Sequence, residues 1–154
     1  MQKVVINDVP KPEPGPGQML VKIKSASLCH SDLMNTGRGG DKPVTLGHEG
    51  VGYVEKIHPS AEGKGFKIGD AVGFLYFLGC CYECEGCSVH QLWCETGKSR
   101  LQGFSVDGFF AEYAVVDYKG TTILPSNLDI TRCAPIFCAG ITGMQNLLLS
   151  LAIH

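Results

Sequence analysis

Five of the eight cysteines lie in one short stretch near the middle of this 154-residue chain. The stretch reads CCYECEGCSVHQLWC, and its C-x2-C-x2-C-x6-C pattern contains Cys81, Cys84, Cys87 and Cys94. Two-residue spacers let successive thiolates surround one ion, and a fourth thiolate a short loop away closes a tetrahedral site with no open position. We therefore predict a structural zinc in the loop of residues 80–94, where the metal supplies folding free energy that so polar a loop lacks.

Other interpretations of the cysteine stretch stay open. The spacing does not choose the metal, so an iron–sulfur cluster is an alternative, and a set of disulfides is another. Cys80 could replace Cys81 in a shifted register, and His90 could replace one thiolate. Because the N-terminus has no apolar run of signal-peptide length, we expect a cytoplasmic protein with reduced, metal-binding thiols.

Charge and hydropathy argue against two classes of partner. The net charge is -2, the pI is near 6.2 and no run of Lys or Arg occurs, so we expect no nucleic acid and no membrane partner. The longest apolar stretch near the C-terminus, LLLSLAI, is too short to span a bilayer. Small molecules or other proteins are the expected partners.

Short alternating runs predict a mainly β fold with few helices. A turn-forming run from Pro10 to Gly17 leads into QMLVKIKSAS, where Val21, Ile23 and Ser25 alternate with lysines. Further β-like runs are VGYVEKI, DAVGF, FAEYAVV and TTILP, with Gly-rich loops between them. This spacing predicts an antiparallel barrel or sandwich, and the length predicts a single domain over 1–154.

Helical signals are limited to three segments. HSDLMNTG predicts a short helix that ends at a glycine, and SNLDITRCAPIF predicts a helix that Ser126 or Asn127 caps. The tail predicts a helix from about Ile141 to Leu149, whose leucines must fold back on the sheet or mediate a homodimer.

Aromatic side chains are candidates either for an apolar pocket or for the core. These candidates are Phe74, Tyr76, Phe77, Trp93 and Phe110.

Three other segments carry side chains that bind metals. SLCHSDL contains Cys29 and His30, LGHEG contains His48 and Glu49, and PIFCAG contains Cys138. Each is weak alone, because an isolated cysteine is more often a small buried hydrophobe. Only the combination indicates a second metal site.

The order of the motifs resembles that of one family. ASLCHSDL, TLGHEGVGYVEKI, KIGDAVG, the four-cysteine loop, GFSVDGFFAEYAVVD and CAPIFCAGIT occur as in zinc-containing alcohol dehydrogenases of the medium-chain dehydrogenase/reductase superfamily, over roughly Val4 to Thr142. The resemblance implies a GroES-like, partly open antiparallel barrel with a projecting structural-zinc loop. It also implies two zinc sites, NAD(P) as the family's cofactor, and a small-molecule alcohol or carbonyl substrate.

The resemblance also implies a catalytic zinc site. Cys29, His48 and Cys138 would bind this zinc and leave one position open for water or a substrate oxygen. Glu49 would be a nearby carboxylate that orients or transiently replaces a ligand.

Residues around this zinc receive roles from the same resemblance. Ser31 would pass a proton from the substrate, and Asp32 would orient the ligand imidazole, with a helix cap as the alternative for both. His30 resembles a residue that meets the cofactor's phosphates, with a solvated surface histidine as the alternative. Met34 stands where the family often has the histidine that completes the proton relay.

The chain also departs from the family pattern. Members continue into a doubly wound domain with a glycine fingerprint, but no G-x-G-x-x-G occurs here, and residues 139–154 match only the start of a linker helix. His58 and Phe109 stand where the family has glycines, the four-cysteine loop is one residue shorter than usual, and an initial edge strand is missing.

Three functions follow as expectations. The chain is the catalytic portion of an alcohol dehydrogenase that cannot bind NAD(P) or transfer hydride alone, or it is a self-contained non-redox zinc enzyme. Such an enzyme would be an isomerase, cyclase, lyase or hydratase of a carbonyl compound. The third expectation is a non-catalytic, zinc-stabilised binding protein.

Overall fold

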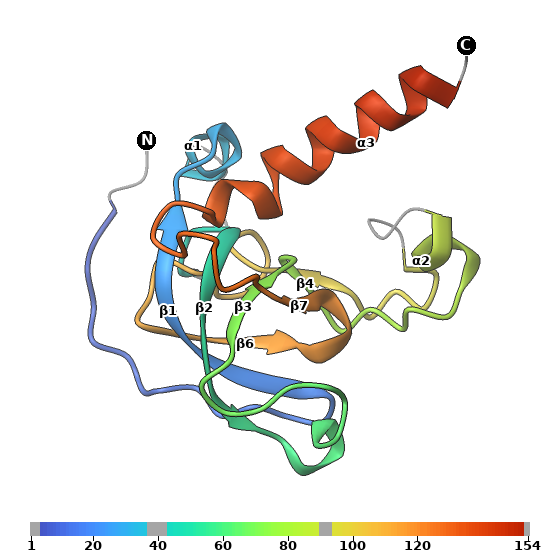
Figure 1. Cartoon of the computed structure of the whole chain (residues 1–154). Coiled ribbons are helices and arrows are strands. Elements are labelled where there is room, and N and C mark those ends of the chain that lie inside the picture. Colours follow the sequence, from blue (N-terminus) through green and yellow to red (C-terminus); the bar gives the residue numbers. More distant parts are fainter. Residues whose placement is uncertain (1–3, 37–42, 90–93, 153–154) are drawn as a thin grey trace.

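A five-stranded antiparallel sheet, in the order β6-β1-β2-β3-β7, is the larger of two sheets in the computed structural model, which describes residues 4–36, 43–89 and 94–152 (Figure 1). The strands are β1 (Gln18–Ser27), β2 (Glu49–Ile57), β3 (Ala71–Phe74), β4 (Phe77–Leu78), β5 (Arg100–Leu101), β6 (Tyr113–Asp117) and β7 (Thr121–Ile123). The helices are α1 (His30–Thr36), α2 (Glu85–Val89) and α3 (Ala139–Ala152), and the 3₁₀ turns are η1 (Pro59–Ala61), η2 (Tyr118–Gly120) and η3 (Ala134–Phe137).

The predicted mainly β fold is confirmed, and the sheet is open rather than closed. In the described part of the chain, β6 and β7 are its two edge strands. The alternation in QMLVKIKSAS produces β1, where Val21 is buried while Lys22 and Lys24 are exposed. β1 pairs with β2 on one side and with β6 on the other, so the residues that follow β1 leave from an inner strand and not from an edge of the sheet.

The main core fills one side of this sheet. Its fully buried members include Val72, Phe74 and Phe109, and the rings of Phe74 and Phe109 meet edge to face at 4.8 Å. Phe109 is therefore a core residue, although the family pattern has glycine at its position. His58 needs no glycine either, because its φ of -67° is ordinary extended backbone.

The helix expected at Ser126 or Asn127 is wrong. Residues 126–132 form turns, and the Asp129 carboxylate accepts hydrogen bonds from the Thr131 N–H and hydroxyl. Such local side-chain bonds compete with a helix. The chain instead makes only the 3₁₀ turn η3, whose Ala134 and Phe137 are buried in a second core cluster.

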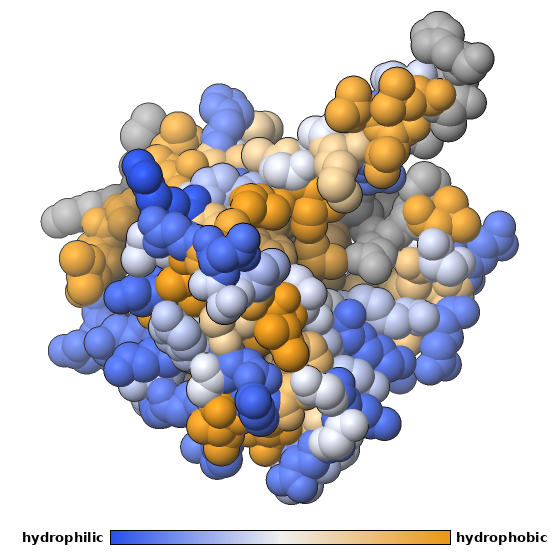
Figure 2. Space-filling view, in the orientation of Figure 1, coloured by the Kyte–Doolittle hydropathy of each residue, from blue (hydrophilic) through white to orange (hydrophobic). Residues whose placement is uncertain are grey.

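The C-terminal helix is longer than expected and projects from the sheet. It extends over Ala139–Ala152 rather than from about Ile141 to Leu149 (Figure 1). Its exposed apolar side chains include Met144, Leu147, Leu148 and Leu151, and Figure 2 shows apolar surface along it. None of the described helices is long and apolar enough to cross a membrane. A homodimer through this helix stays a prediction.

The aromatic candidates divide between core and surface. Phe74 and Phe77 are buried in the core, whereas Phe110 is 40% exposed. Tyr76 lies beside His48, and Trp93 lies outside the described residues.

Candidate metal centres

The four predicted thiolates of the cysteine loop come together. Sγ atoms of Cys81, Cys84, Cys87 and Cys94 all lie within 4.8 Å of one another. The short pair β4 and β5 closes the base of this loop, which carries α2 away from the sheet (Figure 1). Sγ–Sγ distances of 3.8 Å for Cys81–Cys87 and 3.6 Å for Cys94–Cys81 far exceed a disulfide bond of about 2.0 Å. The structure has no disulfide at any of the eight cysteines.

Backbone N–H groups point at these sulfurs. The N–H groups of Cys84 and Cys87 donate to the preceding cysteine of the set, each at 3.4 Å. The Thr96 hydroxyl lowers the pKa of Cys94 to about 6, whereas burial raises the pKa of Cys87 to about 12. Neutral donors thus favour the thiolate of Cys94, whereas burial disfavours that of Cys87.

Cys80 and His90 were the two alternative ligands in this loop. Cys80 is not among the four converging sulfurs, and burial raises the pKa of its thiol to about 11. His90 lies outside the described residues.

A second group forms where three distant segments meet. Ligand atoms of Cys29, His48, Glu49 and Cys138 all lie within 4.8 Å of one another. Cys29 lies between β1 and α1, and His48 precedes β2, which begins at Glu49. Cys138 lies between η3 and α3. The fold therefore brings together all four residues that the resemblance had associated with one metal.

The residue before Cys138 is packed tightly against the sheet. The Phe137 ring rests on β3 at Gly73, where an added Cβ would lie only 1.8 Å from the ring. Phe137 is 6% exposed and packs in the second core cluster. A residue with a Cβ at this point of β3 would not let the ring approach so closely, and Cys138 directly follows Phe137 in the chain.

Asp32 holds both α1 and the imidazole. It is fully buried, and its Oδ2 accepts from the Cys29 N–H at 2.9 Å. Its Oδ1 lies 3.0 Å from His48 Nδ1 and 3.2 Å from the Gly47 N–H. A carboxylate beside Nδ1 accepts a hydrogen bond from the N–H of that nitrogen and leaves the Nε2 lone pair for a metal.

The donor set of this second group suits a zinc-type cation. It offers two sulfurs, one imidazole and one carboxylate, and none of the ion pairs among the described residues involves Glu49. Burial, followed by the neighbouring Cys29 and Glu49, raises the pKa of Cys138 to about 12. Electron-rich groups that lie so close together repel one another when no cation lies between them. The same two sulfurs, imidazole and carboxylate are ligands that zinc commonly takes in proteins.

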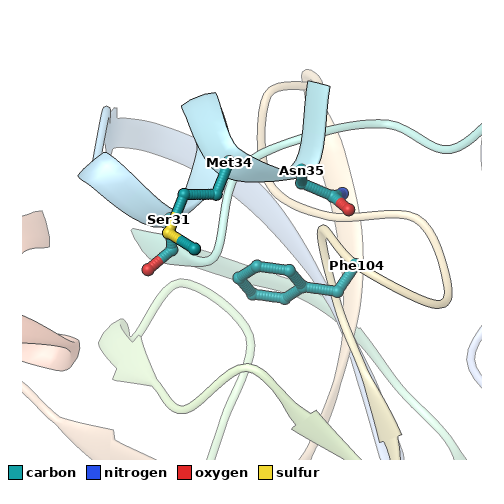
Figure 3. A pocket seen from close by; sticks show the side chains of 4 residues that line it. All are labelled: Ser31, Met34, Asn35 and Phe104. Carbon is teal, nitrogen blue, oxygen red and sulfur yellow. The ribbon is translucent and has the colours of Figure 1, made fainter. Parts of the chain in front are cut away.

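A pocket of about 220 Å³ lies next to the second group and is lined by Ser31, Met34, Asn35 and Phe104. Figure 3 shows the first three on α1 and the Phe104 ring beneath the helix. Ser31 Oγ lies 3.9 Å from Cys29 Sγ, and the Phe104 ring centroid lies 4.8 Å from that of His48. The pocket thus adjoins two members of the second group, with one hydroxyl and an apolar thioether and ring around it.

Comparison with known proteins identifies the family. The sequence profile of the alcohol dehydrogenase GroES-like domain matches residues 15–126. The chain belongs to this family. An alcohol dehydrogenase of Rhizobium meliloti is 39% identical over 152 residues, covering 94% of this chain and 43% of the relative. One of Geobacillus stearothermophilus is also 39% identical, with 92% and 42% covered.

Solved structures agree with this assignment. An NAD-dependent alcohol dehydrogenase superposes with a TM-score of 0.82 at 30% identity, covering 96% of this chain and 43% of that one. The alcohol dehydrogenase of Aeropyrum pernix gives a TM-score of 0.78, also at 30% identity, with 90% and 42% covered. The chain therefore spans less than half the length of the relatives that it matches.

Within this alcohol dehydrogenase domain, sequence reasoning missed several neighbours of the second group. Tyr76 was only an unassigned aromatic, yet its ring centroid lies 5.3 Å from that of His48, and burial raises the pKa of its hydroxyl. Phe104 and Asn35 had no spacing signal, and the Asn35 amide donates to the Gly103 carbonyl at 2.8 Å, which ties α1 to the Phe104 loop. His30, a candidate for phosphate contact, is exposed at the first position of α1.

Proposed function

We propose that this chain is the zinc-binding, substrate-binding part of a zinc-dependent alcohol dehydrogenase. The observation that carries the proposal is the convergence of Cys29, His48 and Cys138 beside a pocket, with the second nitrogen of the imidazole held by a buried carboxylate. These three residues would hold a catalytic zinc. When bound, zinc supplies Lewis-acid polarisation of an alcohol or carbonyl oxygen.

Four other residues around the proposed zinc have proposed roles in orienting a ligand, moving a proton and contacting the substrate. Asp32 fixes the tautomer and direction of the His48 ring, and Ser31, which lines the pocket, carries the hydroxyl that accepts the substrate proton. Met34 and Phe104 exclude water and contact the apolar part of the substrate. Because a thioether holds no proton at neutral pH, we propose that Ser31 passes its proton to solvent and not to residue 34.

The hydride acceptor is expected from outside the described residues. Several relatives are named as dependent on NAD or were solved with NADP, and each is more than twice as long as the part matched here. We therefore propose that NAD(P) is held by further sequence or by another chain, and that these 154 residues alone do not transfer hydride.

The four-cysteine group is proposed as a structural zinc site. Its four thiolates would fill a tetrahedral shell and leave no open position, so it would stabilise the loop and take no part in the reaction. Small-molecule alcohols or carbonyl compounds are the proposed ligands of the other site alone.

Metal stoichiometry tests both assignments. Elemental analysis of the purified protein should give two zinc ions, of which Cys29→Ser removes one and Cys84→Ser removes the other. Cys133→Ala is the matched control, since this buried cysteine belongs to neither group, and it should retain both ions.

Each other result has a definite meaning. One zinc, lost only with Cys84→Ser, would refute the catalytic site and favour a binding protein. Iron in place of zinc in the four-cysteine group would refute the structural zinc. Turnover of a carbonyl compound without any nicotinamide would refute the dehydrogenase proposal in favour of a non-redox zinc enzyme.

A further inference from the structure

Glu49 is a buried carboxylate with an unusual anchor. It is 3% exposed at the first position of β2, and its Oε2 accepts a hydrogen bond from the Ser27 hydroxyl at the end of β1. None of the ion pairs among the described residues neutralises it. A buried carboxylate without a cationic partner is costly unless a metal or several donors compensate its charge.

A bulge in β1 creates this contact. The β1–β2 register shifts between Ile23 and Ser25, so that Ser27 pairs with Glu49, and Ala26 pairs with Gly50. Without the extra residue, Ala26 would stand opposite Glu49, and its methyl group could donate no hydrogen bond. Bulges often direct a particular side chain at a site, and here the bulge brings a hydroxyl to Glu49.

A hydroxyl suits this position better than a lysine or arginine would. A neutral donor fixes the direction of the carboxylate through one oxygen but leaves its negative charge uncompensated. The ligand oxygen of Glu49 lies within 4.8 Å of the Cys29, His48 and Cys138 ligand atoms. The carboxylate therefore keeps both the charge and the position that a cation between these four groups requires.

We propose that Ser27 is a positioning residue that holds the Glu49 carboxylate in the metal site as its fourth ligand. This inference rests on the proposed function, because it concerns the same metal. Glu49 then occupies the position that a substrate oxygen must take, and Ser27 sets how firmly Glu49 stays there. This hydrogen bond therefore contributes to both substrate entry and metal retention.

Co²⁺ titration tests the inference without measuring activity. Co²⁺ is added to protein whose four-cysteine site has kept its metal, and affinity is read from the visible absorption of the bound ion. Ser27→Ala should weaken Co²⁺ binding by about 10- to 100-fold, the usual loss when a residue behind a metal ligand is removed. Ser27→Thr keeps the hydroxyl and should restore most of the affinity.

Two further variants separate positioning from a structural effect. Ser25→Ala removes a hydroxyl from the same strand, where it donates to the Thr131 carbonyl at 3.1 Å, and should bind Co²⁺ like the wild type. If Ser27 acts through Glu49, Ser27→Ala should add little to Glu49→Gln, so the double-mutant cycle should show strong coupling. The Co²⁺ spectrum should change in the same way in both single variants.

The outcomes distinguish this inference from the proposed function. Co²⁺ binding that Cys29→Ser abolishes but Ser27→Ala leaves unchanged would overturn the role of Ser27 alone. Additive losses in Ser27→Ala and Glu49→Gln would overturn it as well, by showing independent effects. If the wild type binds no Co²⁺ outside the four-cysteine site, both the proposed function and this inference fail.

Discussion

The contact between Phe137 and β3 offers a sharp test of how the fold holds Cys138. At Gly73 an added Cβ would lie 1.8 Å from Cζ of Phe137, whereas ordinary van der Waals contact begins at 3.4 Å. In Gly73→Ala, the ring or the strand must therefore move by about 1.6 Å, the difference between these two distances. The ring is rigid and enclosed by the second core cluster, so the backbone of η3 must take up much of the shift.

This displacement is large compared with what a metal site tolerates. Overpacking of this kind costs about 1–3 kcal/mol of stability. Because Cys138 directly follows Phe137, its sulfur moves with the ring, and metal–ligand distances tolerate only about 0.2 Å. We expect Gly73→Ala to lose at least about tenfold in affinity for the metal of Cys29, His48 and Cys138, by analogy with other changes that misplace ligands.

Metal analysis after equilibrium with a competing chelator measures this loss. The four-cysteine site should keep its ion in Gly73→Ala, which also shows that the variant is folded. Gly143→Ala is the matched control, since a Cβ in this part of α3 meets nothing within 4 Å. Gly73→Ala combined with Phe137→Leu should recover part of the affinity. Unchanged affinity in Gly73→Ala would refute the idea that this contact positions Cys138.

Further predictions concern four other residues. Asp32→Asn should weaken metal binding about 10- to 100-fold in chelator competition, and unchanged affinity would contradict its orienting role. Thr96→Val removes the bond that lowers the pKa of Cys94, so acid should release the metal proposed for the four-cysteine group at higher pH than in the wild type. Burial raises the pKa of Asp117 above its ordinary 3.8, so the folded state binds this proton more tightly than the unfolded state does. The free energy of unfolding should therefore fall as the pH rises from the ordinary pKa through the raised one. Urea unfolding of Asp117→Asn at several pH values should lack that fall. Leu147→Glu should abolish the predicted self-association of α3, and light scattering that finds a wild-type monomer at micromolar concentration would rule that association out.

Local sequence patterns predicted the buried face of β1 and the four-cysteine group, because both depend on residues that are close together in the chain. The alternation from Val21 to Ser25 gave the side chains of β1 that face inward, because neighbouring residues of a strand point to opposite faces. The two-residue spacing from Cys81 to Cys87 likewise anticipated converging sulfurs, because so short a segment has few ways to present them. The convergence of Cys29, His48 and Cys138 came only from resemblance, since no local spacing relates three segments so far apart.

Features that depend on register or on loop packing escaped prediction. The bulge in β1 decides whether Ser27 or Ala26 meets Glu49, and nothing in QMLVKIKSAS marks where an extra residue is accommodated. Phe104 reaches His48 because its loop packs against α1, through a bond to a backbone carbonyl that any residue could supply. The segment after Ser126 has a helical cap signal, but tertiary burial of Phe137 and the local bonds of Asp129 prevailed.

Asp32 shows why two interpretations of one residue need not compete. The sequence offered a helix cap and a partner for the imidazole as alternatives, but a carboxylate has two oxygens, and each takes one of these roles. Oδ2 fixes the start of α1, which carries Cys29 and Ser31 on either side of its first residue, while Oδ1 fixes His48. The hydroxyl proposed to carry the proton and two proposed metal ligands are therefore placed by a single buried side chain. A change at Asp32 should consequently shift the thiol, the hydroxyl and the imidazole together.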